Sequence, residues 1–205
     1  MIALYLQRRE GVPGWKLASS MLFLMFCEFY YLLGWATLGW WLNGDNLPAE
    51  FKVIPVIAAA ALLFFLLFYF FFRGELFKPF ALRDRQIFHA FREARWWQYL
   101  TIIAIKTPAL LTAVLVYDYA LGLFGVELSL VQMLGYLPVI FFGAGVPGPM
   151  RAVAITLWVL LLPDHAGEMA AFALVMHNFF IFFNAAIGLI FLRRTQRELF
   201  APTKQ

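Results

Sequence analysis

The sequence predicts an all-α integral membrane protein, a polytopic helix bundle with four full spans, a broken or re-entrant helical pair and an interfacial amphipathic helix. Of its 205 residues, 63% are hydrophobic and only 14% are charged, and the mean hydropathy is +0.78. Such a chain has too little polar surface to cover a soluble globule. Four apolar runs also reach the roughly 20 residues that a helix needs to cross a bilayer, and most basic side chains lie in alternate loops.

The apolar runs define the predicted elements within a single transmembrane domain, residues 1–205. The four full spans are expected at residues 17–42, 53–72, 98–123 and 167–192. Between the last two lie shorter apolar segments at residues 129–142 and 151–162. Each of these is too short to span comfortably, so they predict either a re-entrant hairpin or two tilted helices that meet at a break.

The distribution of lysine and arginine predicts the orientation. Basic residues precede the first span, fill the loop after the second and follow the last, whereas Lys52 is the only cation in the opposite loops. By the positive-inside rule, both termini are expected in the cytoplasm and the protein in the inner (cytoplasmic) membrane. The same flanks account for the pI of about 9.3, so no nucleic-acid partner is expected.

The loop at residues 73–97 is predicted to form a cytoplasmic amphipathic helix in the headgroup region. An interfacial anchor is one interpretation of this helix. The other is a lipid-headgroup site on its polar face. The apolar face would carry Phe80, Ile87, Phe91 and Ala94, and the polar face Arg85, His89 and Arg92.

Ionisable residues inside predicted spans are candidate functional residues, because each costs roughly 2.5–3.5 kcal/mol on insertion. Glu28 lies near the middle of the first span and is too short to reach the interface, so it needs a partner, for which Lys106 and Arg151 are available. The pair would be structural or would contact a substrate headgroup. Lys106 could instead extend to the interface. His177 and Asn178, in the last span, would form interhelical hydrogen bonds or line a substrate site.

The stretch "LPVIFFGAGVPGPMRA", residues 137–152, interrupts the short apolar pair. Prolines remove backbone donors and glycines permit unusual dihedrals, so the helix is expected to unwind here. A half-helix beginning near Pro149 would direct its positive N-terminus, with Arg151, into a polar cavity that receives an anion such as a lipid phosphate. A simple structural kink is the alternative. The residues concerned are Pro138, Pro147, Pro149, Gly143, Gly145 and Gly148.

The segments "YDYALGLFGVELSL", "LPVIFFGAGVPGPMRAVAI" and "ALVMHNFFIFFNAAIGLIFL" resemble the lysylphosphatidylglycerol synthase/flippase transmembrane-domain family, which includes related hopanoid and archaeal glycolipid membrane proteins. That family has a proline, a glycine-rich turn and then Gly-Val-Arg-Glu. Here Gly145 to Gly148 stand in that place with Arg151 nearby, and the glutamate is absent. The opening "YLQRREGVPGW" before the span with Glu28 resembles a later part of the family's chain, which implies further helices upstream.

These observations favour a transporter or flippase that moves an anionic phospholipid or glycolipid between leaflets. The alternative is a non-transporting membrane scaffold or a partner of a lipid- or glycan-modifying enzyme. No catalytic motif, P-loop, dinucleotide fingerprint or metal-ligand spacing occurs, so no enzyme, cofactor or metal is expected. Expected partners are membrane lipids and either a second copy or a missing N-terminal half that closes the cavity. The predicted substrate-binding residues are Glu28, Lys106, Gly143, Gly145, Gly148, Arg151, His177 and Asn178.

Overall fold

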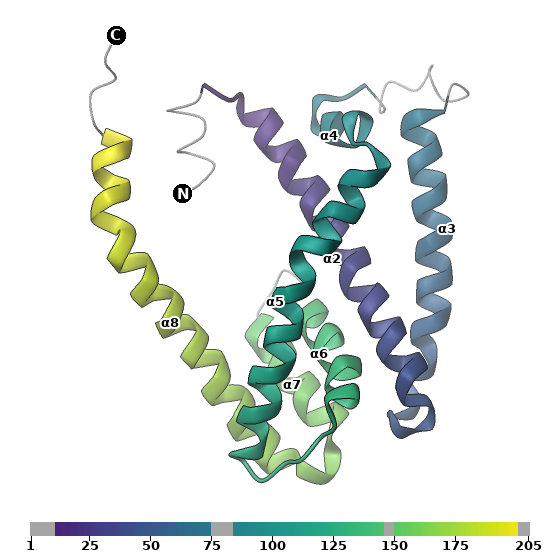
Figure 1. Ribbon diagram of the computed structural model, residues 1–205, viewed down its shortest axis with the longest axis vertical. Coiled ribbons are helices and arrows are strands. Elements are labelled where there is room, and N and C mark those ends of the chain that lie inside the picture. The colour runs from purple at the N-terminus through teal and green to yellow at the C-terminus, as the bar shows by residue number, and fades with distance from the viewer. Residues whose placement is uncertain (1–10, 75–83, 146–149, 201–205) are drawn as a thin grey trace.

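The computed structural model describes residues 11–74, 84–145 and 150–200, with the backbone alone for residues 150–152 and 193–200. All regular structure in these ranges is helical (Figure 1). The α-helices are α2 (Gly14–Asn43), α3 (Ile54–Arg73), α4 (His89–Glu93), α5 (Trp96–Gly122), α6 (Leu130–Gly145), α7 (Met150–Leu161) and α8 (Ala166–Phe200). Four 3-10 turns join them, at Gly44–Asn46, Ala49–Val53, Gln86–Phe88 and Pro163–His165.

Four helical segments are long and apolar enough to cross a membrane, which confirms the predicted membrane-embedded, all-α class. Their ends fall within a few residues of the predicted spans. Helix formation follows from the solvent, because lipid offers no partner for backbone N–H and C=O groups and the helix satisfies them internally. The segments are Gly14–Asn43, Ala49–Arg73, Trp96–Gly122 and Pro163–Leu192.

Helices α6 and α7 form a re-entrant hairpin. Sixteen residues in α6 give a length of about 24 Å, less than the roughly 30 Å of a hydrocarbon core. Helix α6 packs against the lower halves of α2 and α5, and α7 packs against α6 and α8 (Figure 1). The start of α6 and the end of α7 therefore lie at one end of the molecule, and the end of α6 lies toward the middle of the bundle.

The predicted unwinding at Pro138 and Gly143 is wrong, because α6 continues through both residues. Pro138 cannot donate to the carbonyl of Leu134, four residues earlier. That oxygen lies against α2, where a Cβ added to Gly39 would sit 2.7 Å from it. A neighbouring helix thus covers the backbone group that the proline leaves without its helical partner, as membrane helices commonly allow. Residues 146–149, where the remaining predicted break falls, lie outside the described residues.

Helices α2 and α6 approach most closely at two glycines. A Cβ on Gly39 would lie 2.5 Å from the Cα of Gly135, so α2 has no room for a side chain at the crossing, whereas a Cβ on Gly135 would meet the side chains of Asn43 and Leu47 at 3.1–3.3 Å. One turn further on, the Asn43 amide donates to the carbonyls of Gly39, at 2.6 Å, and Val131, at 2.7 Å. Small residues and an interhelical amide bond are typical of helix association in lipid, where apolar burial drives little.

The segment between α3 and α5 is less helical than predicted. In its described part, residues 84–95, a 3-10 turn and the five-residue α4 take the place of the continuous amphipathic helix expected over residues 73–97. Of its predicted apolar face, Phe91 and Ala94 are buried, whereas Ile87 is 41% exposed and Phe80 lies outside the described residues. The Arg73 guanidinium donates to the carbonyl of Ala94, which has an extended backbone, so the chain turns into α5 instead of continuing as helix.

Helix α4 docks on α2 and α3 through aromatic rings. The Phe91 ring contacts the rings of Phe23, Phe68 and Phe72 at centroid separations of 5.1–5.9 Å. The hydroxyl oxygen of Ser19, itself buried, accepts a hydrogen bond from the backbone N–H of Ala90 at 2.8 Å. These contacts hold α4 against the bundle, so it packs on protein and is not only an anchor in the headgroup region.

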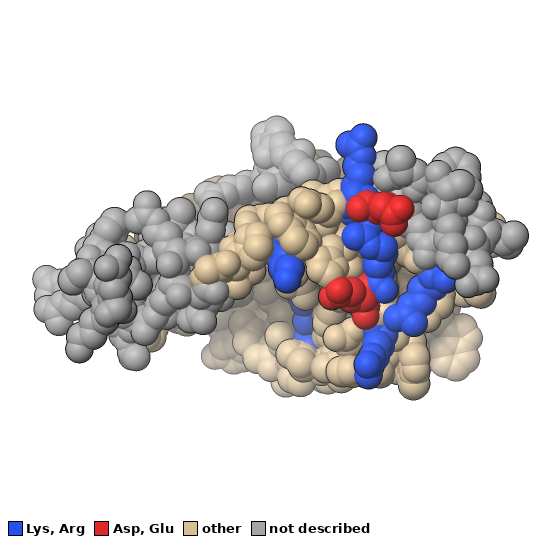
Figure 2. Space-filling view, turned by 90° about the horizontal axis from the view of Figure 1, so that it is seen from above, with Lys and Arg blue, Asp and Glu red and all other residues tan. Residues whose placement is uncertain are grey.

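Helix α2 begins and α8 ends at the same end of the molecule (Figure 1). This agrees with the prediction of an even number of full spans, which puts both termini on one side. We call this end of the molecule the basic end, since basic side chains outnumber acidic ones there among the described residues (Figure 2). Its described cations are Lys16, Arg73, Arg85, Arg92 and Arg95. From the other end α8 runs away from the hairpin, and none of its most apolar stretch is buried.

Replacing Gly39 with alanine is expected to destabilise the protein, because the new Cβ meets the α6 backbone, which cannot move aside as a flexible side chain would. Overpacking of this kind costs about 1–3 kcal/mol. The readout is the midpoint of thermal unfolding in detergent. Gly34→Ala is the matched control, since a Cβ there meets nothing within 4 Å on the same helix; an equal loss in both variants would contradict the close approach of α2 and α6.

Candidate functional site

An ion pair joins the two helices that cross at the centre of the bundle. Helices α2 and α5 both run from the basic end and cross midway along their length (Figure 1). There the Lys106 ammonium contacts the Glu28 carboxylate. The Tyr31 hydroxyl donates to the backbone carbonyl of Lys106 at 3.0 Å and ties the same two helices together. Of the two cations considered from the sequence, Lys106 is therefore the partner of Glu28.

The pair is not sealed inside the bundle. Lys106 exposes 35% of its side-chain surface and Glu28 exposes 42%, and Glu28 lies midway along the 30-residue α2. At that depth an unpaired charge is strongly disfavoured, and each side chain supplies the counter-charge of the other. The arrangement therefore offers an acid and a base, in contact with each other, to a polar group that approaches from outside the bundle.

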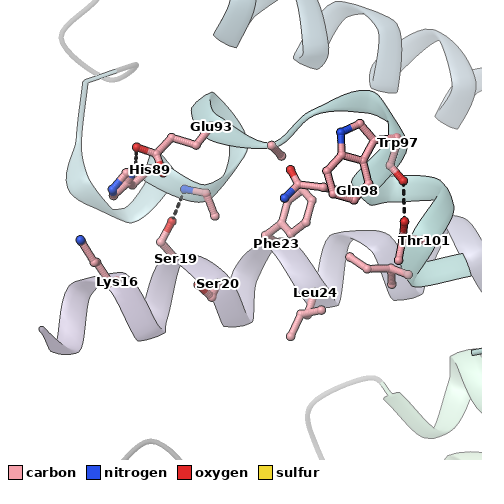
Figure 3. A pocket seen from close by; sticks show the side chains of 13 residues that line it. Lys16, Ser19, Ser20, Phe23, Leu24, His89, Glu93, Trp97, Gln98 and Thr101 are labelled. Atoms are coloured by element: carbon pink, nitrogen blue, oxygen red, sulfur yellow. Dashed lines mark hydrogen bonds and ion pairs between the residues drawn. The ribbon is translucent and has the colours of Figure 1, made fainter. Parts of the chain in front are cut away.

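A polar cleft of about 620 Å³ opens at the basic end, between the first turns of α2 and α5 and beneath α4 (Figure 3). Lys16 and Glu93 supply its charges from opposite walls. Hydroxyl, amide and imidazole groups supply its other polar atoms. These come from Ser19, Ser20, His89, Gln98 and Thr101.

Several of the polar groups in the cleft are held in place. His89 stacks on Trp15 with ring centroids 5.1 Å apart, and its Nδ1 lies 3.2 Å from a Glu93 carboxylate oxygen. The side-chain oxygen of Gln98 accepts from the backbone N–H of Arg95 at 2.6 Å, which leaves its amide N–H groups as donors. Thr101 donates to the carbonyl of Trp97 at 2.9 Å, so its oxygen keeps acceptor capacity for a ligand.

The ion pair lies next to the inner end of the cleft on both helices. On α2, Lys16, Ser20 and Leu24 line the cleft and Glu28 continues their four-residue spacing. On α5, Gln98 and Ile102 line it and Lys106 continues theirs. Residues four apart on a helix lie side by side, and four residues rise roughly 6 Å. The ion pair thus lies one turn beyond the inner end of the cleft, with the apolar Leu24 and Ile102 at the junction, and we call the cleft and the pair together the path. The members of this path are the residues that line the cleft, Glu28 and Lys106.

The hairpin reaches the depth of the ion pair. The ring of Phe142, near the end of α6, contacts the ring of Phe29 at 5.3 Å, and Phe29 is next to Glu28 in the chain. Gly143 packs directly against the Leu157 side chain of α7, so it serves close packing within the hairpin.

The remaining hairpin residues of the predicted site are placed by backbone alone or not at all. Gly145 ends α6, and Arg151 is the second residue of α7. Gly148 lies outside the described residues. Their predicted contact with a substrate stays a prediction.

The other predicted site residues lie away from this path. His177 lines a separate cavity of about 90 Å³ with Tyr117 and Trp158, among α5, α6, α7 and α8. Asn178 is exposed and donates to the carbonyl of Leu174 on its own helix at 2.8 Å, so it shows no interhelical bond.

The three polar residues expected in an interfacial headgroup site do not all line the cleft. His89 lines the cleft. Arg85 is exposed, and its carbonyl accepts a hydrogen bond from Arg92 at 3.0 Å.

Sequence reasoning missed the cleft residues Ser20, Glu93, Gln98 and Thr101. A partial signal existed, since Lys16 and Ser20 lie four residues apart, and Glu28 follows Ser20, as Lys106 follows Gln98, at eight residues with an apolar residue midway between. The contribution of α4 carried no such signal, because its position depends on contacts with α2 and α3, which are distant in the sequence.

Comparison of the chain with protein-family models, with curated proteins and with solved structures finds no match.

The Glu28–Lys106 pair should couple in a double-mutant cycle of stability. Glu28→Gln or Lys106→Met alone leaves one charge at membrane depth, and each is expected to lower the free energy of unfolding by about 1–3 kcal/mol, discounted for the partial exposure of the pair. The double variant leaves no charge and should lose less than the sum, by about 0.5–3 kcal/mol.

Reversible unfolding in mixed detergent micelles measures the cycle. Thr112→Val is the control, since Thr112 is exposed and donates only within α5, to the Pro108 carbonyl at 2.8 Å. Additive single effects would show that the two charges do not depend on each other.

Proposed function

We propose that this protein is a lipid transporter that moves phospholipids between the leaflets of the membrane. One observation carries the proposal. The partly exposed Glu28–Lys106 pair lies midway along α2, one helical turn beyond the inner end of the cleft. A headgroup that crosses a bilayer meets its barrier in the hydrocarbon, and charged side chains placed along its route lower that barrier.

The route begins in the cleft, where Lys16 and the hydroxyl and amide groups receive the headgroup while the acyl chains stay in lipid. It continues to the Glu28–Lys106 pair, from which the headgroup would pass to the opposite leaflet. With the basic end in the cytoplasm, as the positive-inside rule favours, the cleft faces the inner leaflet. Its surrounding cations would attract anionic lipid surfaces.

Two further considerations support the proposal. Re-entrant helical segments at membrane depth are tolerated where they are buried in protein or line a cavity, and transporters use them near the bilayer midplane. The sequence segments that resemble lysylphosphatidylglycerol flippases include this hairpin and the start of α2. Family membership itself stays a prediction.

Transport is testable with purified protein in vesicles that contain phospholipid labelled on one acyl chain. Dithionite bleaches the label in the outer leaflet, and further loss of fluorescence reports transfer from the inner leaflet. The Glu28→Gln/Lys106→Met double variant removes the charges without leaving one unpaired, so it should fold and yet transfer lipid about tenfold more slowly, equivalent to about 1.4 kcal/mol in the barrier.

Thr112→Val is the matched control and should transfer lipid at the rate of the unaltered protein. Unchanged transfer in a folded double variant would show that the ion pair is structural only. If the unaltered protein transfers nothing above protein-free vesicles, the proposal fails, and the scaffold alternative predicts instead that a lipid- or glycan-modifying enzyme co-purifies with the protein.

A further inference from the structure

Building on the proposed lipid transfer, we infer that the favoured headgroup carries one phosphate and one primary ammonium, so that it is zwitterionic. The sequence alone had favoured an anionic lipid, chiefly because of Arg151. The side chains that the structure describes along the path point to a different charge balance.

At mid-membrane the path offers one acid and one base that already contact each other. A purely anionic headgroup that binds Lys106 has to separate it from Glu28, which leaves the carboxylate without its counter-charge in the least polar part of the route. A zwitterion avoids this, because its phosphate pairs with Lys106 while its ammonium pairs with Glu28. Two ion pairs then replace one, and every charge keeps a counter-charge.

The cleft repeats the same balance. Lys16 and Glu93 are the lysine and the carboxylate of its described lining, and they come from α2 and α4, on facing walls (Figure 3). A phosphate near Lys16 and an ammonium beside Glu93, whose carboxylate also contacts His89, would pair with these two charges, and Ser20 and the Gln98 amide are further hydrogen-bonding groups. The binding cleft and the mid-membrane pair thus present the same two charges to a headgroup.

The chemistry of the ammonium group further narrows the class of lipid headgroup. The Glu28 carboxylate accepts a hydrogen bond from the Lys106 ammonium, which carries three N–H donors. A primary ammonium of a headgroup has the same three donors, so it can replace Lys106 as the hydrogen-bond donor to Glu28. A quaternary ammonium such as choline has no N–H group, so it offers Glu28 charge without a hydrogen bond. We therefore expect transfer to be fastest with a primary ammonium, then with choline, and slowest with a headgroup that bears only the phosphate charge.

The test compares three lipids in the unaltered protein, so it does not depend on any variant folding. Vesicles carry phosphatidylethanolamine, phosphatidylcholine or phosphatidylglycerol, each labelled on an acyl chain so that the headgroup stays intact. Transfer of phosphatidylethanolamine should be at least about threefold faster than that of phosphatidylglycerol, a modest discrimination of about 0.65 kcal/mol. In Glu28→Gln this preference should shrink, since the ammonium loses its partner while the phosphate keeps Lys106.

The outcomes separate the inference from the function on which it rests. Equal or faster transfer of phosphatidylglycerol would overturn the zwitterion preference, leave lipid transfer standing and implicate a further cation such as Arg151. Equal rates for the ethanolamine and choline lipids would overturn the role of the N–H donors. Absence of transfer for all three lipids, with the protein folded and inserted, would overturn the proposed function and the inference with it.

Discussion

A charge in hydrocarbon has to find its counter-charge within the protein, and this requirement governs how α2 and α5 meet. Glu28 and Lys106 hold the two helices together at their crossing, and the Tyr31 hydroxyl adds a bond to the α5 backbone at the same level. The cleft above depends on that crossing, because helices joined at mid-membrane diverge toward the basic end and leave room between them. Helix α4, anchored by Phe91 and Ser19, roofs the space that results.

The backbone polar groups of the hairpin also need partners within the protein. A proline inside a membrane helix leaves a carbonyl that water cannot reach, and α6 resolves this by packing the Leu134 oxygen against Gly39 of α2. Asn43 satisfies two more carbonyls at the same interface. The contact between α2 and α6 is thus polar as well as close, which specifies one register in a solvent where apolar side chains alone discriminate poorly.

The spans could be predicted from the sequence because length and hydropathy are local properties. The expected ends at residues 17–42 and 98–123 compare with Gly14–Asn43 and Trp96–Gly122, and Gly44, with a positive φ, stops α2. The need of Glu28 for a cation was also predictable. That the cation would be Lys106 could not be predicted, since Glu28 and Lys106 are 78 residues apart in the sequence and meet only because their helices cross.

What escaped prediction depended on long-range packing. Residues 73–97 have the periodicity of an amphipathic helix, but docking of Phe91 among aromatic rings and the bond from Arg73 to Ala94 end α4 after five residues. The cleft is built from serine, glutamine and threonine residues that carry no motif. Pro138 looked like a break only because the sequence does not show which neighbour covers the exposed carbonyl.

The length of α2 links this architecture to the thickness of the bilayer. Thirty residues make a helix of about 45 Å, well above the roughly 30 Å of a typical hydrocarbon core, so the helix has to lean. A thicker membrane lets it stand more upright and a thinner one tilts it further. Because α2 forms one wall of the cleft and is fixed to α5 at their crossing, its tilt sets how far the walls stand apart, and the mechanical state of the surrounding lipid becomes a determinant of the width of the headgroup site.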